Sequence, residues 1–286
     1  MNIIGLLENA GIYQENRNSF SIEDTEKVRR HFQIERSQNP NLDPALADNL
    51  ISAINEFPKE LLFITNNRIL YNFFARRNYS RNRFNTDYSL SVNEENIKTF
   101  IDKFLSKDLD AFFDQNIDQN RFDVIDDLLN AKEYLPQNSL DNLSQKLSAK
   151  LDFVVNKLDE NPSLSTGAEN IEFIKYRSFY ALLSYFRSEE NDKKIRAIYS
   201  KISGSIVNAA VRNEFLEPMV NSMVNYKPID YELSNTIRSH KDRIDAEKER
   251  EYSSGSSSGG MSTWSVIVII IVVLRLILLL ARLGRA

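Results

Sequence analysis

The stretch LDNLSQKLSAKLDFVVNKL, residues 140–158, decides the fold class of this chain. Its apolar residues recur at spacings of three and four, so they form one stripe along a helix of 3.6 residues per turn. The members of this stripe are Leu140, Leu143, Leu147, Leu151, Val154 and Leu158. We therefore predict a helix here that buries one face in a core.

Glycine usage extends this prediction to the rest of the chain. There are eight glycines, and only Gly5, Gly11, Gly167 and Gly204 precede residue 255. Hairpin turns and phosphate-binding loops use glycine frequently, so a region this poor in it is expected to be helical throughout. We predict an all-α fold, either a helical bundle or an irregular α-solenoid, because no repeat signature of fixed period recurs.

Start and stop signals divide the chain into helices. Proline at a first helical position and capping boxes mark starts at Asp43–Pro44, Pro58, Ser91 with Glu94, and Thr166 with Glu169. Beside residues 140–158, the predicted helices span 43–57, 58–77, 171–186, 193–215 and 231–250.

An apolar run near the C-terminus predicts a membrane span. A bilayer core needs about 20 helical residues, the length of Trp264–Leu283. Arg275 is the only residue from Val266 to Leu280 that is not Ile, Val or Leu. An arginine at a span centre costs about 3 kcal/mol, while its apolar neighbours together contribute about 4–8 kcal/mol, so we expect insertion.

The chain therefore reads as a single-pass, tail-anchored membrane protein. We assign residues 1–252 to a cytoplasmic helical domain with a candidate sub-boundary at 161–166, and 253–263 to a flexible linker rich in Ser and Gly. Residues 264–283 form the transmembrane anchor, and 284–286 a short tail. We expect the N-terminal domain in the cytosol because no export signal precedes it.

Arg275 has three interpretations. Its side chain could extend toward the membrane surface, or pair with an acidic residue in the span of a partner. Alternatively, with Arg282 on the same helix face, it could bind the head group of an anionic lipid.

Composition excludes several function classes. The chain has no cysteine, which excludes thiol catalysis and cysteine-ligated metals, and its two histidines, His31 and His240, are far apart. Residues 1–252 hold all 40 acidic residues and all but three of the 36 Lys and Arg, so this acidic domain argues against nucleic acid as a partner.

Three motif-like stretches predict no chemistry. Residues 255–259 match G-x-S-x-G but lie in the Ser/Gly linker, where the required strand and helix are absent. Residues 114–122 begin like a calcium loop, but Gln119 and Ile125 stand where such a loop needs Gly and Glu, and we expect a loop with helix-capping side chains there. The acidic groups Asp108, Asp110, Asp123, Asp126 and Asp127 fit solvated helix faces. We predict no catalytic residue, no cofactor and no metal site.

One basic stretch stands out: NNRILYNFFARRNYSRNRFN, residues 66–85, which has arginines interleaved with aromatic residues and no acid. Arginine binds carboxylate or phosphate through two parallel hydrogen bonds, so this stretch is a candidate anion- or partner-binding patch. Its candidate residues are Arg68, Arg76, Arg77, Tyr79, Arg81, Arg83 and Phe84. The alternatives are that Leu70, Phe73 and Phe74 pack in the core while the arginines pair with acids, or that the stretch binds single-stranded nucleic acid.

Together these features predict a non-enzymatic adaptor or scaffold. Its helical surface would bind protein partners, as yet unidentified, at the cytosolic face of a membrane, and anionic lipid is an additional candidate ligand. The rival interpretation is a membrane-active or regulatory protein that assembles through Arg275 in its span, with the helical domain as its regulator.

Overall fold

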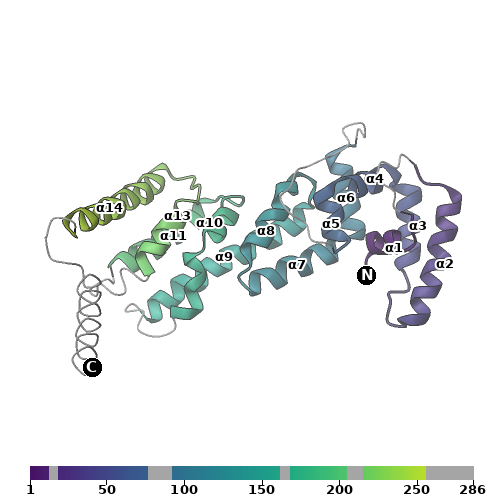
Figure 1. Cartoon of the computed structure of the whole chain (residues 1–286), viewed down its shortest axis with the longest axis horizontal. Helices are drawn as coiled ribbons and strands as arrows, with labels where there is room; N and C mark the ends of the chain where they lie inside the picture. The colour runs from purple at the N-terminus through teal and green to yellow at the C-terminus, as the bar shows by residue number, and fades with distance from the viewer. Residues whose placement is uncertain (13–18, 77–91, 162–167, 205–214, 256–286) are drawn as a thin grey trace, which may run out of the picture. The chain divides into compact units, whose positions relative to one another are not determined.

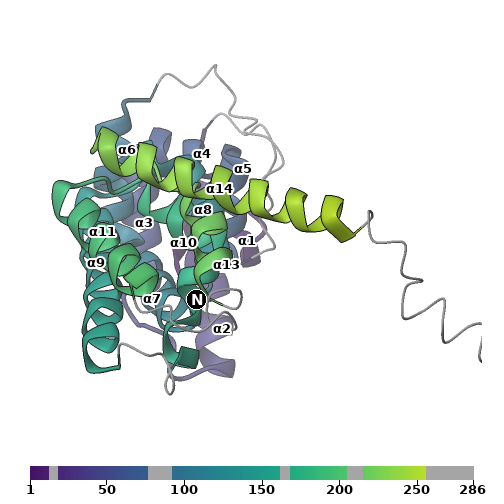
Figure 2. The same ribbon diagram turned by 90° about the vertical axis from the view of Figure 1, so that its left-hand side faces the viewer.

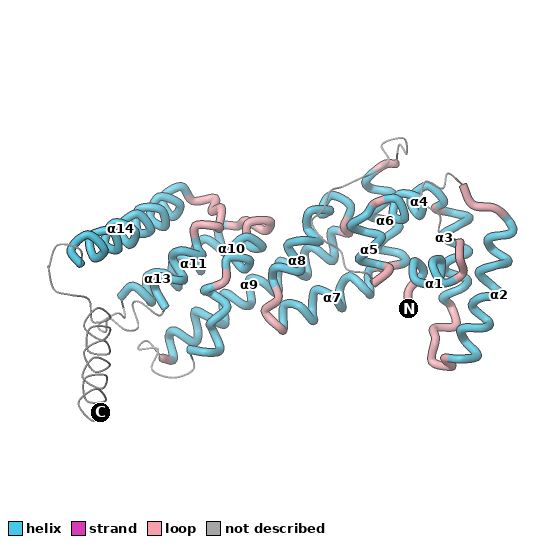
Figure 3. The backbone as a smooth tube through the Cα atoms, in the orientation of Figure 1, coloured by secondary structure: helices cyan, strands magenta, loops and turns pink. Residues whose placement is uncertain are grey.

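The computed structural model describes residues 1–12, 19–76, 92–161, 168–204 and 215–255 (Figure 1). These residues form helices joined by short loops, and no strand occurs among them (Figure 3). The predicted all-helical class is thus confirmed for the described part of the chain. The chain divides into two compact units, Met1–Ile237 and Arg238–Ala286.

The described elements follow one another with few intervening residues. In chain order they are α1 (Ile3–Asn9), α2 (Ile22–Gln38), α3 (Leu46–Glu56), α4 (Pro58–Asn66), α5 (Arg68–Phe74), α6 (Glu94–Phe104), α7 (Ser106–Asp118), α8 (Phe122–Leu128), the 3-10 helix η1 (Leu129–Tyr134), α9 (Gln137–Glu160), the 3-10 helix η2 (Ala168–Lys175), α10 (Arg177–Leu183), α11 (Glu189–Gly204), α13 (Glu217–Met223) and α14 (Tyr231–Gly255).

Helix α9 carries the apolar stripe that predicted the fold, and every member of the stripe is buried. It packs against α7 and α11, and Figures 1 and 2 both show α9 and α11 side by side. Lys194 on α11 binds Asp152 on α9 at 2.7 Å and also donates to the hydroxyl of Ser148 at 2.8 Å. The stripe supplies the apolar contact between these helices, and the lysine links their polar edges.

The single helix predicted over residues 58–77 is wrong, because the structure breaks it at Asn67. Pro58 does open α4 as its first residue, but α4 ends at Asn66 and α5 begins at Arg68. The fully buried side chain of Asn67 accepts hydrogen bonds from the main-chain amides of Ile69 and Leu70, both at 3.1 Å. An asparagine that caps amides two and three residues later starts a new helix.

Several other predicted boundaries move. Pro44 and Ala45 form a turn after Asp43, and α3 begins at Leu46. The side chain that caps α6 belongs to Asn93, which accepts from the amide of Glu95 at 2.9 Å, whereas Ser91 of the predicted capping box lies outside the described residues. The helix predicted over 171–186 is instead the 3-10 helix η2 followed by α10. Helix ends depend on tertiary packing as well as on local capping residues, so boundaries predicted from sequence shift by a few residues.

Helix α14 extends to Gly255, three residues into the predicted linker. Residues 256–286 lie outside the described residues, and with them the rest of the linker and the predicted anchor. Within the described ranges, none of the helices combines the length and apolar composition that a membrane crossing requires.

Candidate functional site

The structure describes two of the seven residues proposed for the arginine–aromatic patch. Arg68 is the first residue of α5 and is exposed, whereas Arg76 follows the end of that helix and is also exposed. Arg77, Tyr79, Arg81, Arg83 and Phe84 lie outside the described residues. The two candidates in the membrane anchor, Arg275 and Arg282, also lie outside them.

The aromatic residues of α5 belong to the core, as one of the sequence interpretations expects. Leu70 and Phe74 are almost fully buried, and Phe73 is 9% exposed. Asn2 fixes the end of the helix, because its side-chain amide donates a hydrogen bond of 3.0 Å to the main-chain oxygen of Phe74. Burial of these side chains holds the end of α5, and therefore Arg76, in a defined position.

Arg76 lies at the edge of a cavity of about 440 Å³ between the end of α5 and α7. Its backbone has φ of 58°, in the left-handed region, and its amide donates to the oxygen of Phe73 at 3.1 Å. Phe73 forms an edge-to-face contact with Phe112 of α7, with ring centroids 4.8 Å apart. The residues that line the cavity are Asn2, Phe73, Phe74, Arg76, Asp108, Ala111, Phe112 and Gln115.

The guanidinium of Arg76 contacts one carboxylate at this edge. Its Nη2 atom is 3.5 Å from Oδ1 of Asp108, and its side chain is 69% exposed. A pair this long and exposed contributes little to stability, so the guanidinium can exchange Asp108 for the carboxylate of a ligand. The cavity thus combines an aromatic wall with a solvent-accessible arginine.

The candidate calcium loop and the acidic groups lie mostly on helices, whereas residues 256–259 of the G-x-S-x-G match lie outside the described residues. Residues 114–118 belong to α7, so the loop expected over 114–122 is wrong for that part and is confined to residues 119–121, where Asn120 has φ of 55°. Asp108 and Asp110 also lie on α7, whereas Asp123, Asp126 and Asp127 lie on α8. Among the described residues, no group of His, Asp and Glu has an arrangement that could hold a metal ion.

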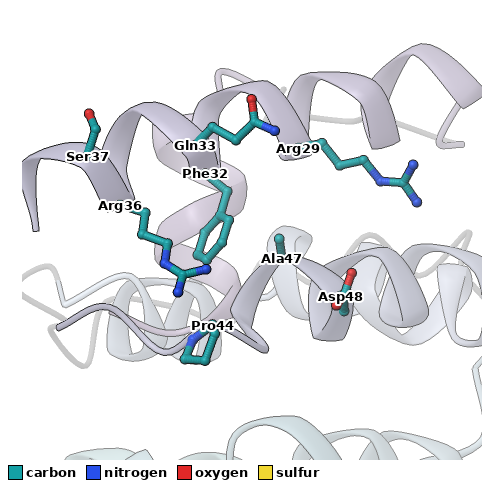
Figure 4. A pocket seen from close by; sticks show the side chains of 8 residues that line it. All are labelled: Arg29, Phe32, Gln33, Arg36, Ser37, Pro44, Ala47 and Asp48. Carbon is teal, nitrogen blue, oxygen red and sulfur yellow. The ribbon is translucent and has the colours of Figure 1, made fainter. Parts of the chain in front are cut away.

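A second surface, which the sequence did not reveal, lies between α2 and α3 (Figure 4). This groove has a volume of about 480 Å³. Figure 4 shows Phe32 and Arg36 pointing from α2 toward Pro44, and Arg29 extending along the groove. Its lining residues are Arg29, Phe32, Gln33, Arg36, Ser37, Pro44, Ala47 and Asp48.

The groove could not be predicted from the sequence, because neither of the two segments that form its walls has a pattern typical of a binding site. The stretch KVRRHFQIER, residues 27–36, resembles a solvated charged helix face, and only its packing against α3 places two of its arginines beside an apolar floor. The spacing of seven between Arg29 and Arg36 was the available signal, since it puts both on one side of a helix.

Comparison with known proteins adds no relative. No protein-family model matches the chain, and neither curated proteins nor solved structures gave a match. The chemistry of these two surfaces is therefore the basis for assigning a function.

Proposed function

We propose that this chain is a membrane-anchored, non-enzymatic adaptor that presents a helical surface to protein partners at the cytosolic face of a membrane. The observation that carries the proposal is the cavity between α5 and α7, where Arg76 stands beside the rings of Phe73 and Phe112. Buried aromatic residues and arginines contribute much of the binding energy in protein interfaces. A partner side chain with an apolar body and an acidic neighbour would fit this combination.

The arrangement of helices in residues 1–237 supports an adaptor. Helices contact elements nearby in the chain, for example α1 with α3, α4 with α6, and α7 with α9. We infer an irregular α-solenoid, an architecture in which each helix packs on its chain neighbours and leaves extended surfaces for binding.

The composition of residues 264–283 supports the anchor. This run has the length of a membrane span, and the Ser/Gly stretch before it would let the helical unit reorient close to the bilayer. A binding surface held near a membrane meets membrane-associated partners at a raised effective concentration.

Affinity capture of the full-length chain from its native membranes tests the proposal. The capture is repeated with nuclease and with Arg76→Gln. Arg68→Gln serves as the matched control, because Arg68 is an exposed arginine of the same stretch that does not line the cavity. We expect a defined set of proteins that resists nuclease, persists with Arg68→Gln and is lost with Arg76→Gln. Captured nucleic acid that disappears with nuclease, or the absence of a stable protein set, would exclude the adaptor.

A further inference from the structure

The groove between α2 and α3 is a separate surface from the cavity at Arg76, since the two share no lining residue. Arg29 and Arg36 are seven residues apart on α2, so they lie within about 20° of each other around the helix and about 10 Å apart along it. The buried Phe32 lies between them and, with the buried Ala47 of α3, forms an apolar floor. The groove thus has a basic rim on one wall and an apolar base.

The groove continues toward the start of α2. A second cavity of about 580 Å³ adjoins it, and Arg29 lines both. This extension is lined by apolar residues of α3 and α4, among them Ile51, Ile54 and Leu62, and by Lys59. From Ile22 to Arg36 the lined face of α2 is about 21 Å long, enough for about four turns of a second helix.

Charge favours an acidic occupant. The charged residues that line the two cavities are Arg29, Arg36, Lys59 and Asp48, and all four are exposed. Within the described part of the chain, neither Arg29 nor Arg36 forms an ion pair, although the chain as a whole is acidic. Guanidinium groups left unpaired beside an apolar floor match a ligand that carries carboxylates on either side of apolar residues.

The chain's own remaining segments do not supply such a ligand. Residues 13–18, 162–167 and 205–214 have no net charge, whereas 77–91 and 256–286 are basic. Residues 238–255, the start of the second unit, carry five basic and five acidic residues and also have no net charge. None of these segments is acidic overall, so a partner protein is the better match for the charge of the groove.

We propose that the groove between α2 and α3 binds an acidic amphipathic helix of a partner protein. Acidic residues at i and i+7 of that helix would each contact one arginine, Arg29 or Arg36. Apolar residues at i+3 and i+4 would pack on Phe32 and Ala47, as in other complexes where a helix lies in a groove. This proposal does not depend on the function of the cavity at Arg76.

Site-specific photocrosslinking of the full-length chain in its native cells tests the proposal. The photoreactive residue benzoylphenylalanine replaces Gln33, which is exposed at the groove. In a control chain it replaces Ile34, the next residue, which is 55% exposed and does not line the groove. We expect an adduct from position 33 only, with a segment in which acidic residues spaced by seven flank apolar ones, as sequenced by mass spectrometry.

Charge reversal then tests the contacts. A synthetic peptide of the crosslinked segment is titrated into the full-length chain, and binding is followed by fluorescence anisotropy. The double substitution Arg29→Glu with Arg36→Glu should weaken binding at least tenfold. Lys27→Glu with Arg30→Glu is the matched control, because it reverses two charges of the same helix that do not line the groove, and it should change binding less than threefold. Circular dichroism melting of both variants checks that each is folded.

Four results would overturn the proposal: no adduct at position 33, an adduct with a second copy of this chain, a segment without acidic residues, or equal weakening by both double substitutions. The affinity capture depends on the cavity at Arg76 and not on the groove. Failure of the groove experiments would therefore leave the adaptor proposal standing, and failure of the capture would leave the groove proposal standing.

Discussion

The hydroxyl of Tyr226 donates a hydrogen bond of 2.5 Å to Oδ1 of Asp192, and both side chains are buried. The other oxygen, Oδ2, accepts from the main-chain amides of Ile229 and Asp230, at 2.9 and 2.7 Å. A single carboxylate on α11 therefore fixes the turn from which α14 begins. Arg196, one turn further along α11, adds an ion pair with Asp230.

Replacing this carboxylate should destabilise the helical unit. Asp192→Asn turns one acceptor into a donor that faces either the hydroxyl or the two amides, so we expect the free energy of unfolding to fall by about 2–3 kcal/mol. Urea titration of the full-length chain in mild detergent, followed by circular dichroism, measures the change. Asp152→Asn is the control, because that carboxylate is 55% exposed and its ion pair with Lys194 should contribute less than about 1 kcal/mol. Equal effects of the two substitutions would contradict the assigned role of Asp192.

Two buried tyrosines predict a loss of stability at alkaline pH. Burial raises the pKa of Tyr180, and burial together with the hydrogen bond to Asp192 raises the pKa of Tyr226, above the ordinary value of 10.0. Above pH 10 the unfolded chain loses these protons while the folded chain keeps them. The contribution is therefore complete below pH 10, and the free energy of unfolding should decrease above it by up to about 1.4 kcal/mol per pH unit for each tyrosine.

Urea titrations at pH values from 8 to 11.5 measure this slope. The double variant Tyr180→Phe with Tyr226→Phe should have a flatter dependence above pH 10, whatever its stability at pH 8. An unchanged slope would show that other groups cause the alkaline loss.

The stripe of α9 should tolerate truncation poorly. Leu147 is fully buried, so Leu147→Ala should lower the free energy of unfolding by about 2–5 kcal/mol through lost burial and the cavity left behind. Phe153 on the same helix is 40% exposed, and Phe153→Ala removes more atoms but should cost only about 1 kcal/mol. Thermal melting followed by circular dichroism compares the two variants. A larger loss of stability in Phe153→Ala than in Leu147→Ala would contradict the burial of the stripe.

The left-handed backbone of Arg76 predicts that glycine stabilises this position. A residue with a side chain at φ of 58° costs about 1–2 kcal/mol that glycine avoids. Because Arg76→Gly and Arg76→Ala both remove the contact with Asp108, their difference isolates the backbone. The glycine variant should unfold at a higher urea concentration than the alanine variant, which corresponds to a free energy of unfolding higher by about 1 kcal/mol. Equal midpoints would show that the backbone at position 76 is not strained.

Arg275→Leu separates the two functional interpretations of the predicted span. If residues 264–283 serve only as an anchor, the variant should stay in the membrane fraction after alkaline extraction and keep the partners of the unchanged chain. The control is removal of residues 264–286, which should release the chain from membranes. Loss of complexes from a variant that stays in the membrane would favour assembly through Arg275.

The helical class and the buried face of α9 could be predicted because both are local properties. The spacing of Leu140 to Leu158 sets one apolar stripe, and a helix with such a stripe must bury it against another element whatever the partner is. Burial of Leu70, Phe73 and Phe74 follows the same pattern. The sequence alone also predicts a membrane-spanning helix at 264–283, because length and apolar composition suffice for that prediction.

Only the tertiary structure decided what depends on residues distant in sequence. Asn67 caps amides only two and three residues away, but its side chain is fully buried, and that burial depends on the helices that pack around it. Arg29 and Arg36 form a basic rim because α3, a separate segment, supplies the opposite wall. Asp192 meets the turn at Tyr226 across 34 residues. The spacing of apolar residues predicts which face of a single helix is buried. A groove, or a carboxylate that bonds to two segments, depends on which helices pack together, and the packing of the whole chain determines that.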